Sequence, residues 1–169
     1  MDVKANTGPY GNHCLTVPVN AVSKSMPLFL CDNVGFEVES YYTNIPPTGA
    51  YQGYGAPQGS YALQTAMAEL AVKLGMDQLE LIEKNRVREG VMLEILKCLG
   101  EGREGKPERV ASCGLGPALK KGAELIDWGR KEESDNPDVK IFQGVVIVQQ
   151  GSGLPGLDSA SAVLRMLGD

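Results

Sequence analysis

Residues Asn44–Gly59 read N-I-P-P-T-G-A-Y-Q-G-Y-G-A-P-Q-G, and this stretch decides how the rest of the chain is interpreted. Proline lacks a backbone donor and glycine loses much conformational entropy in a helix, so the stretch is predicted to be an ordered loop. Gly53 and Gly55 leave the backbone without side-chain walls, so that another chain or a ligand can approach closely. Tyr51 and Tyr54 add flat rings with polar tips. The alternative is a structural turn whose tyrosines only pack.

A strand and a helix are predicted to flank this loop. Val34–Thr43 alternates with the two-residue period of a half-buried strand. Pro57 suits the first turn of a helix. The apolar residues that follow it recur at helical spacing: Leu63, Ala66, Met67, Leu70, Ala71 and Leu74. Gly75 is expected to end this helix in the left-handed conformation, and Asp77 with Glu80 forms a capping pattern that begins a second helix.

Strand-like segments are predicted near both ends of the chain. Met1–Asn6 alternates like a strand, but the turn that follows it offers no partner strand. A helix opens at Pro117, the β-branched run Ile141–Val148 predicts a buried strand, and Ser161–Met166 begins another. A strand without a partner at either end suggests a piece cut from a larger domain.

These elements together predict an α+β fold, with a mixed or antiparallel β-sheet packed against several helices. Residues 1–169 are expected to form a single unit, with a motif-bearing part at 1–99, a flexible link at 100–114 and a helix-and-strand part at 115–169. The link is inferred from glycines that alternate with charged residues in Gly100–Pro107. Unpaired strand edges at the cut ends favour a homo-oligomer.

Composition narrows the classes of function. The 169-residue chain is 43% hydrophobic and 22% charged, which is typical of a globular protein. Its net charge of -5 and the lack of a basic stripe argue against nucleic-acid binding. The sequence holds neither an apolar run of the roughly 20 residues that a membrane span needs nor a leader of the signal-peptide kind. We therefore expect a cytoplasmic protein that does not bind membranes.

Metal ligands and nucleophiles are sparse. His13 is the single histidine and lies in a turn rich in glycine and asparagine, so it is expected to be a solvated loop residue rather than a base. The cysteines are too widely spaced for a zinc or iron–sulfur site, and reduced, mostly buried thiols are expected for Cys14, Cys31, Cys98 and Cys113.

The loop sequence resembles a known family motif. N-I-P-P-T-G-A-Y-Q-G-Y-G-A-P-Q is similar to N-x-P-P-x-G-A-x-R-G-F-G-x-P-Q of the xanthine dehydrogenase and aldehyde oxidase family, the molybdenum hydroxylases. The similarity continues through Ala68–Ala71, Leu74–Asp77 and Asn85–Gly90. The resemblance implies that the chain is a fragment of the large, molybdopterin-binding subunit, and a truncated part of its molybdopterin-binding domain.

The resemblance also implies an activity for the full-length parent. Enzymes of this family hydroxylate a carbon atom of an N-heterocycle or an aldehyde, with water as the source of oxygen. The parent would use molybdopterin as its cofactor, iron–sulfur and flavin subunits or domains as its partners, and a small-molecule substrate. The catalytic glutamate lies outside this fragment, so the fragment alone is expected to be inactive and to bind no molybdopterin. The alternatives are a non-catalytic binding or assembly module with the same fold and a purely structural domain.

Site residues follow from the resemblance position by position. Gln52 and Gly53 take cofactor-binding positions, and Gln52 is a neutral amide where the motif has arginine, although an amide still forms hydrogen bonds. Tyr54 takes the place of an aromatic residue that meets the substrate ring edge-on. Leu154 is the nearest match to a second substrate-binding wall. Neither a catalytic residue nor a metal ligand is expected within the fragment.

Overall fold

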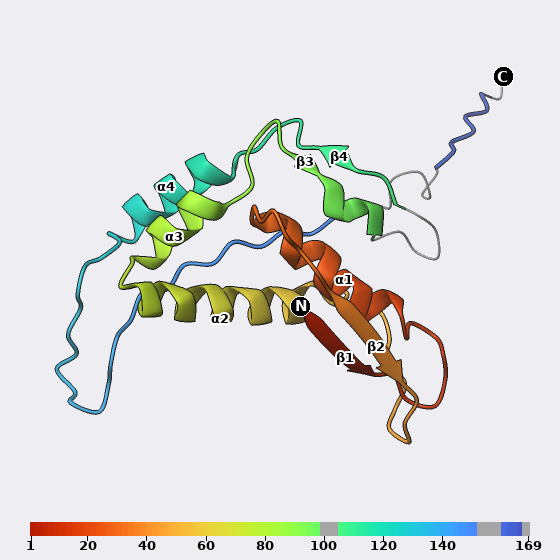
Figure 1. The fold of residues 1–169 in the computed structure, drawn as a ribbon, viewed down its shortest axis with the longest axis horizontal. Coiled ribbons are helices and arrows are strands. Elements are labelled where there is room, and N and C mark those ends of the chain that lie inside the picture. Colours follow the sequence, from red (N-terminus) through yellow and green to blue (C-terminus); the bar gives the residue numbers. More distant parts are fainter. Residues whose placement is uncertain (99–104, 152–159, 167–169) are drawn as a thin grey trace.

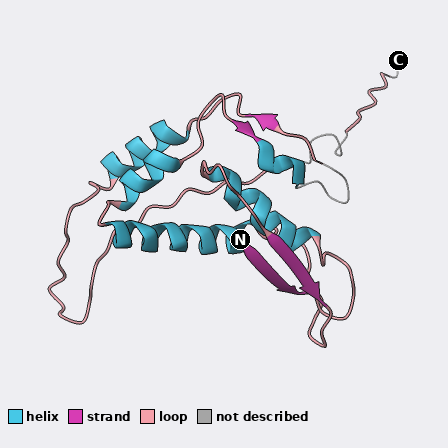
Figure 2. Ribbon diagram, in the orientation of Figure 1, coloured by secondary structure: helices cyan, strands magenta, loops and turns pink. Residues whose placement is uncertain are grey.

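The computed structural model describes residues 1–98, 105–151 and 160–166. The fold is α+β, as predicted, and its strands form two separate pairs (Figure 1, Figure 2). Across the described ranges, none of the helices has the length and apolar character to span a membrane. In chain order the elements are β1 (Asp2–Asn6), α1 (Thr16–Ser25), the 3-10 helix η1 (Met26–Leu28), β2 (Glu37–Tyr41), α2 (Ala56–Leu74), α3 (Gln78–Asn85), β3 (Met92–Leu93), the 3-10 helix η2 (Glu94–Cys98), β4 (Glu108–Arg109) and α4 (Leu115–Leu125).

The N-terminal strand β1 has a partner, so the prediction that it lacks one is wrong. It pairs in parallel with β2, and Val3 lies opposite Val38. The N-terminal ammonium group also donates a hydrogen bond of 2.7 Å to the carbonyl oxygen of Gly35. Parallel strands need a long crossover, which here contains α1. A pattern confined to neighbouring residues cannot reveal a pairing between segments so far apart in the chain.

Helices α1 and α2 pack so closely that a side chain cannot fit at two positions between them. A Cβ atom at Gly55 would lie 2.0 Å from the carbonyl oxygen of Val17. A Cβ atom at Gly59 would lie 1.9 Å from the carbonyl oxygen of Ala21. Both distances are far shorter than van der Waals contact. The object that approaches the open backbone at Gly55 is therefore the chain's own helix α1.

The ends of α2 match the prediction. Pro57 lies in its first turn, and Gly75 caps its C-terminus with φ 62°. Asp77 then caps α3 by accepting a hydrogen bond of 3.1 Å from the backbone N–H of Glu80. These boundaries depend on residues close in sequence, which explains why they can be predicted.

The buried face of α2 differs from the predicted apolar stripe. Of the stripe residues, only Ala71 is buried, and Leu70 and Leu74 are exposed. The close approach to α1 requires small side chains at the contact, and a hydrophobic period does not take side-chain size into account. The buried residues are Ala56, Gly59, Ser60, Gln64 and Ala71.

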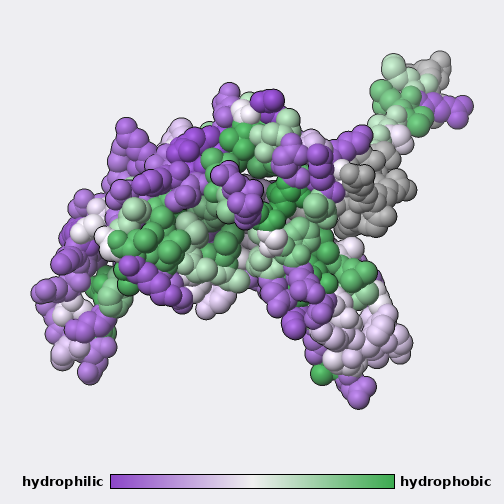
Figure 3. All heavy atoms as spheres, viewed as in Figure 1, coloured by the Kyte–Doolittle hydropathy of each residue, from purple (hydrophilic) through white to green (hydrophobic). Residues whose placement is uncertain are grey.

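The hydrophobic core lies where α3, α4 and the segment 144–148 meet. Leu28, Ile82, Leu119 and Ile147 form this core. Figure 1 shows the C-terminal segment running between α2 and the pair α3 and α4, and Figure 3 shows hydrophobic residues in the middle of the same face. The helix predicted at Pro117 is α4, which begins two residues earlier.

The run Ile141–Val148 joins no sheet within the described residues, so the prediction of a buried strand there is wrong. Its carbonyl groups accept hydrogen bonds from glutamine side chains instead. Gln64 Nε2 donates to Ile147 at 2.6 Å, and Gln78 Nε2 donates to Val145 at 2.8 Å. The side chains still alternate, because Ile147 is 2% exposed whereas its two neighbours are more than half exposed.

Three further predictions concern the segment Ser161–Met166, the link at 100–114 and the cysteine thiols. Ser161–Met166 is exposed and forms no strand among the residues that the structure describes. In the predicted link 100–114, residues 100–104 lie outside the described residues, and β4 pairs antiparallel with β3. The thiols are free as expected, but none is buried: Cys14 and Cys113 are half-buried, and Cys31 and Cys98 are exposed.

Candidate functional site

The loop before α2 holds a turn of unusual backbone conformation. Gly53, Tyr54 and Gly55 have φ values of 83°, 44° and 91°, so three successive residues are left-handed. The turn is closed by a hydrogen bond of 2.7 Å from the N–H of Tyr54 to the carbonyl of Tyr51. Glycine adopts this conformation readily, whereas a tyrosine held there costs roughly 1–3 kcal/mol. Tyr54 therefore needs compensating contacts.

Two hydrogen bonds supply that compensation. The hydroxyl group of Tyr54 lies 2.5 Å from Nδ1 of His13 and 2.5 Å from Oγ1 of Thr16. The rings of His13 and Tyr54 also meet edge to face, with centroids 5.4 Å apart. At roughly 1 kcal/mol for each hydrogen bond, the two bonds offset most of the strain. His13 is half-buried in this contact, so the prediction of a solvated loop residue is wrong.

The turn that carries His13 is itself fixed to the strand β2. The hydroxyl group of Ser40 donates a hydrogen bond to the carbonyl oxygen of Cys14. A Cβ atom at Gly11 would lie 2.9 Å from the hydroxyl oxygen of Tyr42, so the same turn also lies close against the chain just after β2. Segments that precede the loop in sequence therefore support it.

The predicted cofactor-binding residues Gln52 and Gly53 lie side by side in the same turn as Tyr54. The side chain of Gln52 is exposed. A Cβ atom at Gly53 would lie 2.5 Å from the ring of Pro57, so a glycine is required there for internal reasons too. Among the hydrogen bonds of the described residues, the backbone N–H groups of Gln52 and Gly53 donate none. Leu154, the fourth predicted site residue, lies outside the described residues.

Sequence reasoning missed His13 and Thr16 as neighbours of the loop. Both lie about forty positions before Tyr54, with separations of 41 and 38 residues. Nothing in the local sequence of either residue indicates this contact. The pairing of β1 with β2, the hydrogen bond from Ser40 to Cys14 and the glycine contacts between α1 and α2 bring the two segments together.

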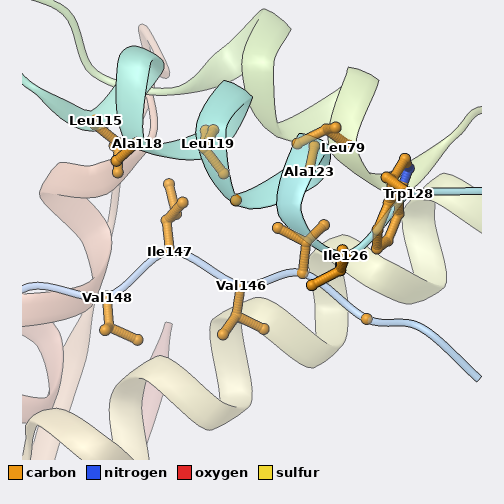
Figure 4. Close-up of a pocket in the computed structure, with 13 residues that line it drawn as sticks. Leu79, Leu115, Ala118, Leu119, Ala123, Ile126, Trp128, Val146, Ile147 and Val148 are labelled. Carbon is orange, nitrogen blue, oxygen red and sulfur yellow. The ribbon is translucent and has the colours of Figure 1, made fainter.

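An apolar groove of about 500 Å³ lies between α4 and the C-terminal segment (Figure 4). In Figure 4, Ile147 points toward α4, whereas Val146 and Val148 point away from it. The indole nitrogen of Trp128 donates to the carboxylate of Asp77 rather than into the groove. The groove therefore offers hydrophobic contact rather than acid–base chemistry. Its lining includes Leu79, Leu115, Ala118, Leu119, Ala123, Ile126 and Trp128.

Two carboxylates away from the loop have shifted pKa values. On α3, hydrogen bonds of 2.6 and 2.7 Å from the Arg86 guanidinium group lower the pKa of Glu83. On β2, a hydrogen bond from the Tyr41 hydroxyl group, followed by the charge of Lys4, lowers the pKa of Glu39. Within the described residues, no three His, Cys, Asp or Glu side chains gather as a metal site would require.

Comparison with known proteins identifies the family. The model of the molybdopterin cofactor-binding domain matches residues 1–86, which is more than half of the chain. A protein of Escherichia coli strain K12 named "Probable hypoxanthine oxidase XdhD" is 51% identical over 172 residues and is matched by all of this chain. The xanthine dehydrogenase molybdenum-binding subunit of Escherichia coli O157:H7 is 30% identical over 146 residues, or 86% of this chain. The chain spans about 18% of the length of each of these relatives.

The fold leads to the same family. The aldehyde oxidoreductase of Desulfovibrio gigas superposes with a TM-score of 0.56 at 25% identity. The match covers 73% of this chain and 13% of that enzyme. The loop motif, the family model and the solved structure agree, and the chain belongs to the molybdopterin cofactor-binding domain family of xanthine dehydrogenases and aldehyde oxidoreductases.

Proposed function

We propose that this chain forms one wall of the molybdenum site in the large subunit of a longer molybdenum hydroxylase. In that enzyme, Gln52 and Gly53 contact the molybdopterin cofactor, and Tyr54 and Leu154 line the substrate site. The substrate is a small molecule with an oxidisable carbon in an N-heterocycle or an aldehyde. Iron–sulfur and flavin subunits or domains accept the electrons, and the four free thiols favour a reducing, cytosolic compartment.

One observation carries this proposal: the left-handed turn presents Gln52 and open backbone donors on a firmly held support. The side chain of Gln52 is exposed, and its amide both donates and accepts hydrogen bonds. The N–H groups of Gln52 and Gly53, which donate to no group of the described residues, would meet the oxygen atoms of an anionic or pterin-like group. The donor set therefore fits a polar, oxygen-rich cofactor.

The support behind the turn also suits a binding site. Helix α2 begins directly after the turn at Ala56, and α1 lies against Gly55 and Gly59. Sites on well-packed elements keep their geometry better than sites on free loops. When bound, the cofactor supplies the redox centre and the oxygen-transfer chemistry. The residues of this chain would bind the cofactor and the substrate and orient them.

A test of this role uses the full-length enzyme. Gln52→Ala should lower the molybdenum content or kcat/KM by roughly tenfold, because a hydrogen bond to the cofactor is lost. Gln52→Arg should retain cofactor, because a guanidinium group also donates hydrogen bonds. Gln58→Ala is the matched control, because Gln58 is an exposed amide in the first turn of α2. Equal behaviour of Gln52→Ala and Gln58→Ala would contradict the assignment of Gln52.

The isolated 169-residue chain provides a second test. We expect it to bind no stoichiometric molybdenum and to hydroxylate no purine, nicotinate or aldehyde, because the catalytic glutamate lies elsewhere in the parent. Metal analysis and a hydroxylase assay measure both. Turnover by the isolated chain would show that this expectation is wrong.

The alternative, a binding or assembly module, is favoured by exposed apolar side chains at the end of α4 and in the C-terminal segment. Leu125 and Phe142 are 73% and 86% exposed. If this surface mediates self-association, sedimentation should detect a dimer that Phe142→Asp dissociates. Tyr61→Asp, at an exposed position on α2, is the matched control. A strict monomer at high concentration would rule out self-association through this surface.

A further inference from the structure

We infer that His13 and Thr16 are positioning residues that clamp the Tyr54 hydroxyl group, so that Tyr54 presents its ring, and not its hydroxyl, to a ligand. The clamp itself stands on contacts within the chain. Its consequence for a ligand rests on the proposed function, in which Tyr54 lines the substrate site.

The clamp uses two of the three hydrogen-bonding positions of the phenol. A tyrosine hydroxyl group has one donor and two acceptor positions. His13 Nδ1 and Thr16 Oγ1, each at 2.5 Å, use two of them for either tautomer of the imidazole. When Nδ1 accepts, the phenol donates to His13 and accepts from Thr16; when Nδ1 carries the proton, the phenol accepts from His13 and can donate to Thr16. A ligand would have to break one of these bonds to gain the phenol proton.

The partners of the phenol are rigidly placed. Thr16 is the first residue of α1, and His13 lies in the turn before it, where its carbonyl oxygen accepts a hydrogen bond from the N–H of Val17. Gly55, directly after Tyr54, touches the backbone of α1 at Val17. The backbone contact and the hydroxyl clamp therefore tie the turn to the same end of α1 at two separate points.

The hydrogen bonds fix the hydroxyl group of Tyr54, and the edge-to-face contact with His13 also fixes the plane of its ring. The two ring planes are perpendicular, and the centroids are 5.4 Å apart. A ring held at its backbone, its tip and one side keeps a single orientation. Tyr54 is half-buried, and because its hydroxyl group is engaged, a ligand in contact with this side chain would meet ring carbon, which suits a planar heterocycle or aromatic aldehyde that is recognised by its shape and π-face.

Hydrogen exchange of the isolated chain tests the clamp. The N–H groups of Tyr54 and Ala56 close the turn by donating to Tyr51 and Gly53, so their exchange reports its opening. Thr16→Val should speed exchange of both amides by roughly 2- to 10-fold, the effect of losing one net hydrogen bond, whereas Thr16→Ser should restore protection. Tyr54→Phe, which removes both bonds, should have the largest effect.

Tyr51→Phe is the matched control, because Tyr51 is 80% exposed in the same loop. NMR supplies a second signature: the Tyr54 hydroxyl proton should exchange slowly and show a cross-peak to the His13 ring. A freely exchanging hydroxyl proton would overturn the clamp, and so would equal effects of Tyr51→Phe and Tyr54→Phe on exchange.

The full-length enzyme separates the clamp from the proposed function. Thr16→Val should lower kcat/KM by several-fold through the misplaced ring, and Thr16→Ser should restore it. If Thr16→Val opens the turn without changing kcat/KM, then Tyr54 does not line the substrate site. That result would contradict the proposed function while leaving the clamp intact.

Discussion

The Cα atom of Gly59 in α2 lies directly against the carbonyl group of Ala21 in α1, and an added Cβ atom would come within 1.9 Å of that oxygen. The obstacle is backbone, which cannot move aside as a flexible side chain can. This contact fixes how α1 supports the loop that carries Tyr54.

Gly59→Ala should therefore destabilise the protein by about 1–3 kcal/mol, despite the gain in helix propensity, because the two helices must separate. Urea unfolding followed by circular dichroism measures the free energy of unfolding. Gly122→Ala in α4 is the control, because a Cβ atom there meets nothing within 4 Å. It should raise the stability by about 0.5–1 kcal/mol. Loss of stability in Gly122→Ala alone would refute the packing argument.

Gln64 provides a second test of the packing. Its side chain is 4% exposed and donates a hydrogen bond to the carbonyl oxygen of Ile147. Its Oε1 atom is buried and has no hydrogen-bond partner within the described ranges of the chain. Gln64→Glu would bury an unpaired charge and should destabilise the protein by about 2–4 kcal/mol at neutral pH. Burial raises the pKa of the introduced carboxyl group, so the loss should shrink as the pH falls and this group becomes neutral.

Gln78→Glu is the comparison for this test. Gln78 donates to Val145 in the same way but is only half-buried, so the introduced charge keeps part of its hydration. Thermal unfolding at several pH values should show a smaller loss than for Gln64→Glu. Similar losses in the two variants would mean that burial is not the deciding factor.

The ion pair of Glu83 and Arg86 predicts a dependence of stability on pH. Hydrogen bonds from Arg86 lower the pKa of Glu83 below its ordinary 4.5. The pair therefore contributes its full stability above about pH 4.5, and this contribution is lost as the pH falls toward the lowered pKa. Glu83→Gln should cost less than about 1 kcal/mol at pH 7, because the carboxylate is half-exposed.

Urea titrations between pH 3 and pH 7 measure this contribution. Glu83→Gln should flatten the acid side of the stability curve relative to the unaltered chain. Glu69→Gln, which removes an exposed carboxylate from α2, should leave that side unchanged. Parallel curves for the unaltered chain and Glu83→Gln would contradict the prediction.

Sequence alone predicts the features that depend on neighbouring residues. The ends of α2, the cap at Asp77 and the strand β2 follow from local chemistry, and the structure confirms them. The pairing of β1 with β2 and the contact of His13 with Tyr54 do not follow from local chemistry, because each of them joins segments that are far apart in the chain.

The prediction of a strand at Ile141–Val148 is wrong for a different reason. Its β-branched residues and its alternation are those of a strand, and the alternation of exposure is present. What a single segment cannot encode is its hydrogen-bond partner, which here is a pair of glutamine side chains on α2 and α3. The roles of Gln52, Gly53 and Tyr54 came from the family motif and remain proposals.

The turn before α2 also governs how freely each of its positions can mutate. Gly53 and Gly55 are restricted by backbone conformation and by close contacts, so nearly every substitution there should be purged. Gln52, which lies between Tyr51 and Gly53, is exposed, and neither backbone conformation nor a close contact restricts its side chain. A substitution at position 52 should therefore cost little folding free energy, and glutamine in the place of the motif's arginine is compatible with the turn.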